Sequence, residues 1–254
     1  MKISKQVILQ GLKQLLCIPY IYISHGFKLP HSNYCAKVQY MLPFEGEWTV
    51  INGGCEKEFS HSWRVPTQRY AYDFVIMDNN GKTYNGHSDK LTSYACYGKN
   101  VLAPADGIVI AIGDICDDEK PFGDEITEMT AKDIRGNFIL IKHAEKEYGF
   151  IGHLQPQSII VEIGQRVHQG EIIARCGNSG NSSEPHIHFH LQDGINFFTS
   201  AGIPITFQNI CISQKQGYEN YDKRKISDIK KSTSLKTKIC RGQQVCNVHN
   251  YLND

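Results

Sequence analysis

Residues 176–190 read Cys-Gly-Asn-Ser-Gly-Asn-Ser-Ser-Glu-Pro-His-Ile-His-Phe-His, and they are the most informative stretch of the chain. Three imidazoles alternate with other side chains, at positions 186, 188 and 190. In a β-strand, alternation of this kind places them on one face, about 6.5 to 7 Å apart. Imidazole is the commonest metal ligand and suits proton transfer near neutral pH. The pattern therefore predicts a metal-dependent hydrolytic site on a strand, with an exposed polar strand edge as the alternative.

The segments before this stretch predict a β-sheet. Short runs rich in β-branched residues are bounded by glycine turns, which is typical of strand-turn-strand structure rather than of helices. These runs lie within residues 101–114, 136–143, 152–154 and 161–174. We therefore expect a mainly β fold whose core is an antiparallel sheet.

The order of motifs along the chain resembles that of the lysostaphin/LytM-type zinc metallopeptidases. The motifs are Ala-Pro-Ala-Asp-Gly, Gly-Asn-x-x-x-Ile-x-His, Gly-His-Leu, Gly-x-x-Val-x-x-Gly, Gly-Asn-Ser-Gly-x-Ser and Pro-His-x-His-Phe, within residues 42–207. The resemblance implies a β-sheet core of the duplicated hybrid motif type and a zinc ion in a groove. It also implies a peptide or peptidoglycan substrate, since most members cut cross-links or stem peptides of peptidoglycan.

The same resemblance implies roles for four residues. His188, the second histidine of Pro-His-x-His, and Asp73 match zinc ligands of the family. His186, the first histidine of that motif, and His153, in Gly-His-Leu, match the two catalytic imidazoles that lie beside the metal.

The third zinc ligand departs from the family pattern. The family has a histidine four residues before the aspartate, and here that position holds Arg69, whose protonated guanidinium cannot bind zinc. The nearest upstream imidazole, His61, is the predicted ligand instead. The alternatives are His87 and a degenerate site without a third protein ligand, which would make the chain a non-catalytic module that binds peptides or glycans.

The residue types themselves permit hydrolysis. Two neutral imidazoles and one carboxylate hold zinc and leave a fourth position for water, as in catalytic rather than structural sites. A zinc-bound water has a pKa near 7, so hydroxide is available at neutral pH. His153 and His186 would then deprotonate the water, stabilise the oxyanion or protonate the leaving amine, and the sequence does not assign these roles between them.

Three features near the histidines have less definite roles. His190 stands where the family has an acidic or amide side chain, and it either supports a ligand or faces solvent. The loop of residues 177–183 is either a connector or a contact for substrate backbone. Glu184 is left out of the catalytic set, because this family uses histidines as bases.

Composition predicts one globular enzyme with two extensions. The 254 residues carry a formal net charge of +1, which gives no general attraction to nucleic acid. We expect an N-terminal extension over residues 1–41, a peptidase domain over 42–208 and a basic C-terminal extension over 209–254. This last segment predicts a solvated tail, with contact to an anionic wall polymer as the functional alternative.

The N-terminal segment of residues 2–24 predicts an amphipathic helix that ends at Pro19. Its apolar positions 8, 12, 15 and 16 share one helical face, which we expect to dock on the rest of the protein. Polar residues interrupt the apolar run and no small-residue cleavage site follows, so we expect neither a signal peptide nor a membrane span. Nine cysteines favour a reducing compartment, whereas the family's substrate lies outside the cell, so localisation stays open.

Overall fold

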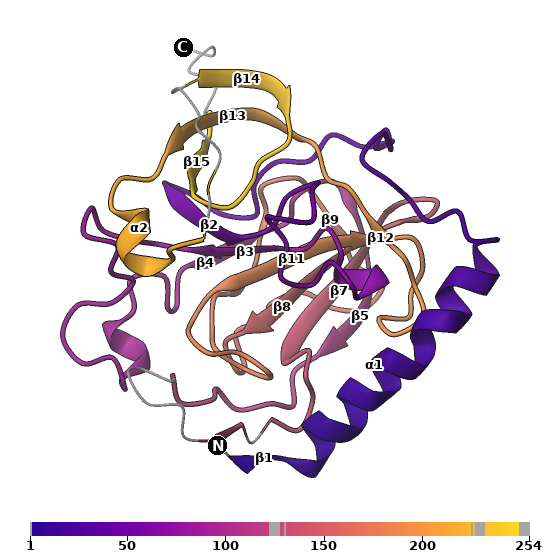
Figure 1. Ribbon diagram of the computed structural model, residues 1–254, viewed down its shortest axis with the longest axis horizontal. Coiled ribbons are helices and arrows are strands. Elements are labelled where there is room, and N and C mark those ends of the chain that lie inside the picture. Colours follow the sequence, from indigo (N-terminus) through magenta and orange to yellow (C-terminus); the bar gives the residue numbers. More distant parts are fainter. Residues whose placement is uncertain (1, 122–127, 130, 225, 227–231, 249–254) are drawn as a thin grey trace.

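The computed structural model describes residues 2–121, 128–129, 131–224, 226 and 232–248 (Figure 1). Its helices are α1 (Lys5–Ser24) and α2 (Tyr218–Tyr221), with short 3₁₀ helices at Pro66–Gln68 and Leu91–Ser93. Its strands are β1 (Lys2–Ile3), β2 (Trp48–Asn52), β3 (Tyr72–Val75), β4 (Asn100–Leu102), β5 (Gly107–Gly113), β6 (Glu128–Met129), β7 (Asn137–Ala144), β8 (Glu147–Leu154), β9 (Arg166–Val167), β10 (Ile172–Arg175), β11 (Ile187–Gln192), β12 (Gly202–Ile203), β13 (Phe207–Gln214), β14 (Ser232–Thr237) and β15 (Gln243–Asn247).

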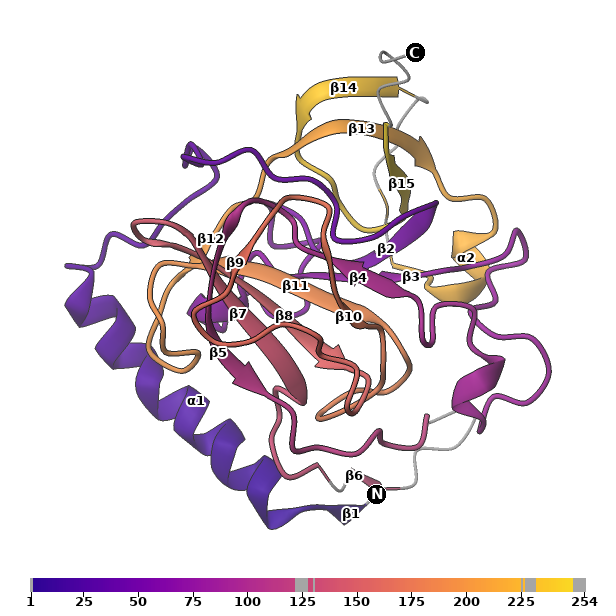
Figure 2. The same cartoon turned by 180° about the vertical axis from the view of Figure 1, so that it is seen from behind.

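One large antiparallel sheet forms the centre of the molecule (Figures 1 and 2). Its strand order is β14-β13-β15-β2-β3-β11-β8-β7-β5-β9, and β12 also pairs with β11. The expected mainly β fold with an antiparallel core is therefore confirmed. Because β11 lies between β3 and β8, His188 is opposite Asp73 on one side and Gly152 on the other.

Strand β11 is buried on both faces, and the two faces differ in chemistry. Ile187, Phe189 and Leu191 point into the main hydrophobic core. The alternate residues carry the histidines, and a second cluster of aromatic residues, including Phe150 and Phe197, lies on that side. A period of two thus sends apolar side chains to the core and imidazoles to the site.

Helix α1 differs from its predicted form in extent and in orientation. Ser4 caps its N-terminus by accepting a hydrogen bond from the Val7 amide, and the helix continues through Pro19 to Ser24. The predicted end at Pro19 is wrong, because proline removes one backbone hydrogen bond but tertiary contacts beyond it hold the last turn. One of these contacts is Ile21, which is 1% exposed.

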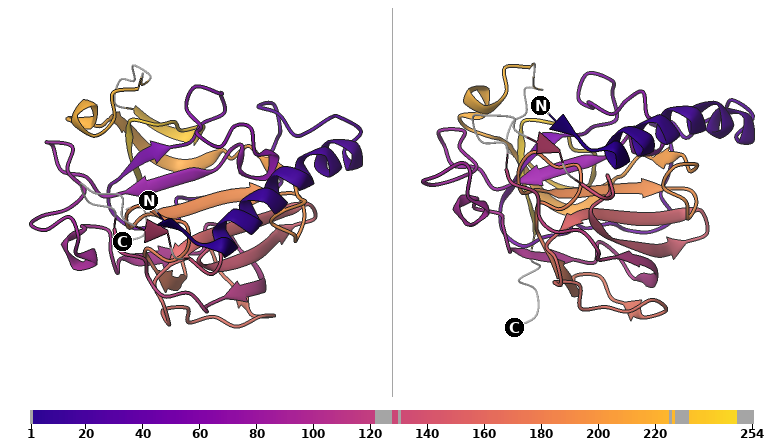
Figure 3. Two further views of the ribbon diagram at one scale, coloured as in Figure 1. Left: turned by 60° about the horizontal axis from the view of Figure 1, so that its bottom comes forward. Right: turned by 90° about the horizontal axis from the view of Figure 1, so that it is seen from below.

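The face of α1 that we expected to dock is turned to the outside instead. Positions 8, 12, 15 and 16 are each half or more exposed, while Gln10, Gln14, Cys17 and Ile21 lie toward the rest of the chain. Figures 1 and 3 show the helix lying along the outside of the molecule. The helix docks through hydrogen bonds and a few small contacts, which hydrophobic periodicity does not reveal.

Helix α1 is also long and apolar enough to cross a membrane by length and composition. It has 20 residues, with a mean hydropathy of 1.3 over its most apolar window, and 6% of that window is buried. The expectation that this segment is too short and too polar for a span is therefore wrong on these two criteria. A helix of 20 residues is about 30 Å long, which matches the hydrocarbon core of a bilayer.

The C-terminal segment is part of the sheet and not a solvated tail. Strand β15 pairs with β2 and β13, and β14 pairs with β13, so the described part of the segment extends the central sheet. Alternate residues such as Ile210, Ile212 and Val245 are buried and join the main core. The expected boundaries at residues 42 and 208 stay predictions, as does a contact of this segment with an anionic wall polymer.

Candidate metal centre

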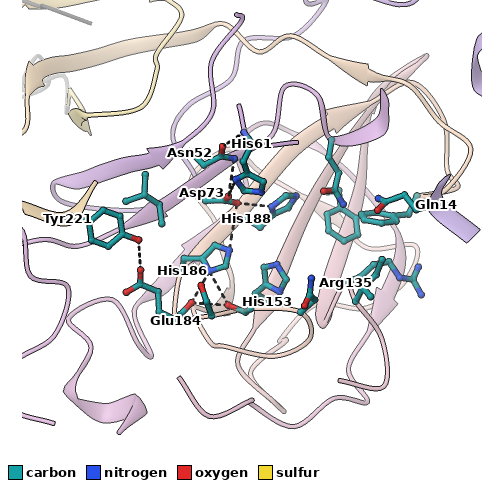
Figure 4. A pocket seen from close by; sticks show the side chains of 18 of the residues that line it. Gln14, Asn52, His61, Asp73, Arg135, His153, Glu184, His186, His188 and Tyr221 are labelled. Carbon is teal, nitrogen blue, oxygen red and sulfur yellow. Dashed lines mark hydrogen bonds and ion pairs between the residues drawn. The ribbon is translucent and has the colours of Figure 1, made fainter. Parts of the chain in front are cut away.

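A cleft of about 350 Å³ opens beside the histidine face of β11 (Figure 4). Segments that are far apart in the sequence meet there, from α1 at one end of the chain to α2 at the other. The lining residues are Gln14, Ile51, Asn52, His61, Gln68, Asp73, Ile134, Arg135, Phe150, His153, Asn181, Ser182, Ser183, Glu184, His186, His188, Phe197, Tyr221 and Arg224. All five predicted site residues are in this set.

Asp73 lies at the centre of the cleft as a buried carboxylate. Its Oδ1 is 2.8 Å from Nδ1 of His188 and 3.6 Å from Nε2 of His186, and its Oδ2 accepts a hydrogen bond of 3.0 Å from Asn52. Burial raises the pKa of Asp73, but the hydrogen bond with His188 and the nearby imidazoles outweigh it and hold that pKa below its usual range. Asp73 is therefore ionised near neutral pH, as a metal ligand must be.

His153 is the next-to-last residue of β8 and has a strained backbone conformation. Its φ is +59°, in the left-handed region that residues other than glycine seldom adopt, and such strain is typical of functional sites. Its Nδ1 donates a 2.7 Å hydrogen bond to the carbonyl of Ser179. Burial, together with His186 and His188, lowers the pKa of His153 well below its usual range. The ring is therefore neutral, and its Nε2 keeps an unshared electron pair.

The loop of residues 177–183 holds that carbonyl in place. Gly136 and Gly180 approach so closely that a Cβ added to Gly180 would lie 2.2 Å from the amide nitrogen of Gly136. Both also have a positive φ. Glycine is therefore required at each position by the lack of space for a Cβ and by the backbone conformation. Asn181 is one of three loop residues that line the cleft. The loop thus orients His153 as well as connecting two strands.

His186 has a similar arrangement directly before β11. Its Nδ1 donates to the carbonyl of Glu184 at 2.8 Å, which leaves Nε2 as the acceptor that points toward Asp73. Figure 4 shows His153, His186 and His188 turned toward one another beside Asp73. One ligand atom from each of these histidines lies within 4.8 Å of the others.

This set of atoms fits a metal ion. Acceptor nitrogens of His153 and His186 and a carboxylate oxygen of Asp73 converge on one spot, and a cation stabilises such a group of acceptors. Imidazole nitrogens and a carboxylate are the donors that zinc takes in catalytic sites. Among the residues that the structure describes, His153, His186 and His188 form a group that could hold a metal ion.

His61 lies at the edge of this group. Its Nδ1 is 3.9 Å from Oδ2 of Asp73, and its backbone amide donates to Asn52, which also contacts Asp73. Its side chain is 56% exposed, so it can rotate toward the spot where the other ligand atoms meet. The assignment of His61 as third ligand stays a prediction.

The other residues weighed for the third ligand lie elsewhere. His87 is exposed and is not among the residues that line the cleft. Arg69 donates to the hydroxyl of Tyr22 in the N-terminal helix and to the carbonyl of Trp63. Its guanidinium therefore does not occupy the place of the missing family histidine.

His190 does not face solvent, which removes one of its two predicted roles. It is fully buried between the rings of Phe150 and Phe197, and its Nδ1 is 2.9 Å from Nε2 of His188. Burial, with a smaller contribution from His188, lowers the pKa of His190 to about 3. The position thus supports His188 from behind.

Several cleft residues carry no signal in the sequence motifs. Asn52 and Tyr221 come from outside the matched motifs, and Gln14 comes from the N-terminal helix. Tyr221 donates to Glu184, which also accepts a 2.6 Å hydrogen bond from Thr83. Only chain folding could have identified these residues, because their spacing from the histidines in sequence is arbitrary.

Comparison with known proteins agrees with this site. The model of peptidase family M23 matches residues 89–200. Peptidoglycan DD-endopeptidase ShyC of Vibrio cholerae is 33% identical over 76 residues, which are 29% of this chain and 17% of that protein. The chain therefore spans much less than two thirds of the length of this curated relative.

Two solved structures are also similar. The catalytic domain of a mutant of the prophage-encoded M23 protein EnpA from Enterococcus faecalis shows 16% identity and a TM-score of 0.36, covering 69% of this chain and 93% of that one. The catalytic domain of lysostaphin from Staphylococcus simulans shows 20% identity and a TM-score of 0.34, covering 67% and 89%. The family match confirms the resemblance predicted from the motifs. Residues 89–200 therefore match peptidase family M23, and His153, His186 and His188 lie inside the matched residues.

Proposed function

We propose that this protein is a zinc-dependent endopeptidase that hydrolyses peptide bonds of peptidoglycan cross-links or stem peptides. The observation that carries the proposal is the convergence of three buried imidazoles beside the ionised Asp73. The family match supports a peptidase, and the peptidoglycan DD-endopeptidase among its relatives supports the substrate class.

In the proposed site, His61, Asp73 and His188 hold the metal. Zinc, when bound, supplies a water molecule of lowered pKa and polarises the substrate carbonyl. Asp73 and His188 are in place for this role, and His61 completes the set by a side-chain rotation from its exposed position.

His153 and His186 are proposed to move protons. Each has its Nδ1 fixed as a donor to a backbone carbonyl, so each presents an unprotonated Nε2 to the cleft. An imidazole in this state accepts a proton from the attacking water, and the imidazolium so formed stabilises the oxyanion or protonates the leaving amine. The low pKa of His153 favours its neutral form before the reaction.

The test measures zinc content and cleavage in the same preparations. We expect about one zinc per wild-type chain and release of peptides from purified muropeptides. His188→Ala should lose both zinc and cleavage, whereas His153→Ala should keep zinc and lose at least about 100-fold in kcat. His168→Ala is the matched control, because this histidine is 73% exposed and is not among the residues that line the cleft. Wild-type cleavage by His153→Ala would contradict the proposed mechanism.

A second function is favoured by one observation, the presence of Arg69 where the family has a zinc ligand. A degenerate family member would bind peptides or glycans without turnover and would hold zinc weakly. Zinc content of His61→Ala separates the two, since a loss of zinc relative to wild type assigns the third ligand to His61. If wild type itself takes up little zinc after zinc is supplied and the excess removed, the binding module is the correct function.

A further inference from the structure

A row of hydrogen-bonded side chains lies behind the candidate metal ligand His188. His188, His190 and Gln192 follow one another on one face of β11, joined by contacts of 2.9 Å between the two imidazoles and 3.1 Å to the Oε1 of Gln192. The amide nitrogen of Gln192 then donates a 2.6 Å hydrogen bond to the carbonyl of Gly194. All three side chains are buried, with His190 and Gln192 at 0% exposure.

The carbonyl of Gly194, at the end of this row, determines which atom is the donor in each hydrogen bond of the row. The Gly194 carbonyl can only accept, so Gln192 turns its nitrogen to Gly194 and its oxygen to His190. Nε2 of His190 must then donate to that oxygen, which leaves Nδ1 of a neutral His190 as an acceptor. Nε2 of His188 therefore donates to His190, so Nδ1 is the nitrogen of His188 left to face Asp73, at 2.8 Å.

We propose that His190 and Gln192 are positioning residues that fix the tautomer of His188, so that its Nδ1 is presented to the metal. The consequence for metal binding rests on the proposed function, whereas the tautomer itself does not. Partners of this kind, hydrogen-bonded to the far nitrogen of a ligating histidine, typically change metal affinity about 10- to 100-fold. The chain uses a histidine for this task where the family has an acidic or amide side chain.

The first experiment reads the tautomer directly in metal-free protein. Nitrogen-15 NMR of the imidazoles should show Nε2 of His188 protonated in wild type. His190→Leu removes the acceptor and should shift His188 to a mixture of tautomers. His190→Gln should restore the wild-type state, because its oxygen can accept from His188 while its nitrogen donates to Gln192. Phe197→Leu is the control, since it alters the packing around His190 but leaves the row of hydrogen bonds intact.

The second experiment measures zinc affinity by competition with a chelator. We expect a loss of about 10- to 100-fold in His190→Leu and less than about threefold in His190→Gln. An unchanged tautomer of His188 in His190→Leu would overturn the proposal. If wild type binds no zinc, the proposed function fails, and the NMR result still decides whether the row fixes His188.

A separate observation concerns the outer face of α1. Its apolar side chains are half or more exposed along the whole helix and the turn after it. They are Ile8, Leu9, Leu12, Leu15, Leu16, Tyr20, Ile23 and Phe27. The inner side is the more polar one: Gln10 bonds the backbone at residues 132 and 134, and Gln14 lines the cleft. A helix that covers a protein core turns its apolar face inward, whereas α1 turns its apolar face outward.

The segment that carries this face contains charged residues of one sign only. Residues 1–44 include five lysines and no aspartate or glutamate. Lys5 and Lys28 are exposed near the two ends of the helix. An apolar face of this length, flanked by lysines, matches a bilayer whose headgroups are anionic.

We infer that α1 lies with this face in the surface of an anionic membrane. The contact places the cleft close to the bilayer, because Gln14 on the other side of the same helix lines it. In contrast to a spanning helix, the interaction keeps the polar contacts between α1 and the rest of the chain.

Flotation with vesicles tests this contact on the full chain. Wild type should float with phosphatidylglycerol vesicles and bind much less to phosphatidylcholine vesicles. The double variant Leu12→Gln, Leu16→Gln should lose at least about tenfold in binding, since it removes two large apolar side chains from the face. The control is Ile160→Gln, Ile163→Gln, which changes two exposed isoleucines away from the helix.

Three outcomes would overturn the membrane contact. They are absence of flotation, equal flotation of the double variant and its control, and dimerisation of wild type that the double variant abolishes. The last result would assign the face to a second copy of this chain. Circular dichroism of both variants should match wild type, because every changed side chain is exposed.

Discussion

At the scale of single residues, the site depends on which atoms lack a proton. Asp73 is ionised, and His153 and His186 have their Nδ1 atoms committed to backbone carbonyls. The resulting group of acceptors is unfavourable by itself and favourable around a divalent cation. Asp73 is the residue that contributes a full negative charge, so it should matter most for metal affinity.

Asp73→Asn tests this directly. The amide has nearly the same shape and can still contact His188, but it removes the negative charge. We expect zinc affinity to fall by at least about 100-fold, measured by chelator competition. Asp106→Asn is the matched control, because that carboxylate is 68% exposed and lies outside the cleft. Equal zinc affinity of the two variants would show that Asp73 is not a ligand.

At the scale of elements, β11 buries its apolar face, whereas α1 exposes its apolar face. In β11 a period of two separates a core face from a site face, as the sequence predicts. In α1 the most apolar face is outside, and the helix is held by Ile21, Cys17 and a few polar contacts. Binary patterning therefore identifies the face of a strand in this protein but misassigns the face of the helix.

The pair Ile21→Ala and Ile23→Ala tests how α1 is held. Ile21 is 1% exposed and Ile23 is 66% exposed, and both lie in the last turn of the same helix. We expect Ile21→Ala to lower the free energy of unfolding by about 2 to 4 kcal/mol, and Ile23→Ala by less than about 1 kcal/mol. Urea denaturation followed by fluorescence gives both values. The reverse order would mean that the outer face of α1 is the one that docks.

At the scale of the whole molecule, the two ends of the chain complete the site. The described part of the C-terminal segment adds β14, β13 and β15 to the sheet next to β2 and β3, and β3 carries Asp73. Tyr221 reaches from α2 to Glu184, two residues before His186. The central domain and the C-terminal segment thus share one sheet, and the cleft has walls from all three segments.

Truncation after residue 208 should therefore destabilise the whole protein. The deletion leaves β2 without its neighbour β15 and uncovers core residues that pack against Ile210 and Val245. We expect an insoluble or unfolded product by circular dichroism. Truncation after Val248, which keeps every described strand, is the control and should remain folded. A folded, zinc-binding fragment ending at residue 208 would show that the predicted domain boundary is an independent folding boundary.

Acid should also weaken the fold, because the half-buried ring of His143 has a buried Nε2 that the fold keeps neutral. Burial lowers its pKa to about 4, and its Nε2 has no hydrogen-bond partner among the described residues. An unfolded histidine takes up a proton near pH 6.5. Between about pH 6.5 and 4 the unfolded state therefore binds more protons than the folded state, and the free energy of unfolding decreases as the pH is lowered.

The comparison of His143→Leu with His168→Leu isolates this effect. Between pH 7.5 and pH 5, the loss in free energy of unfolding should be smaller by about 2 kcal/mol in His143→Leu than in His168→Leu. His168 is 73% exposed and should behave like wild type. Urea denaturation with excess chelator keeps metal binding out of the comparison. Equal losses in both variants would mean that His143 takes up its proton in the folded state.

The amino-acid sequence was enough to predict the sheet, the resemblance to peptidase family M23 and five residues that the structure brings to one cleft. Alternation in 187–192 and the glycine-bounded runs before it fix strand faces and turns locally, since side-chain direction in a strand depends only on parity. The motifs that carry His153, His186 and His188 are likewise contiguous in sequence. Each of these inferences needs only neighbouring residues.

Only the tertiary structure decided how distant segments meet. It placed His61 3.9 Å from Asp73, buried His190 behind His188 and brought Gln14 and Tyr221 to the cleft. It also turned the apolar face of α1 outward and added the C-terminal strands to the sheet. These features depend on contacts between residues far apart in the chain, whose energies no local pattern records.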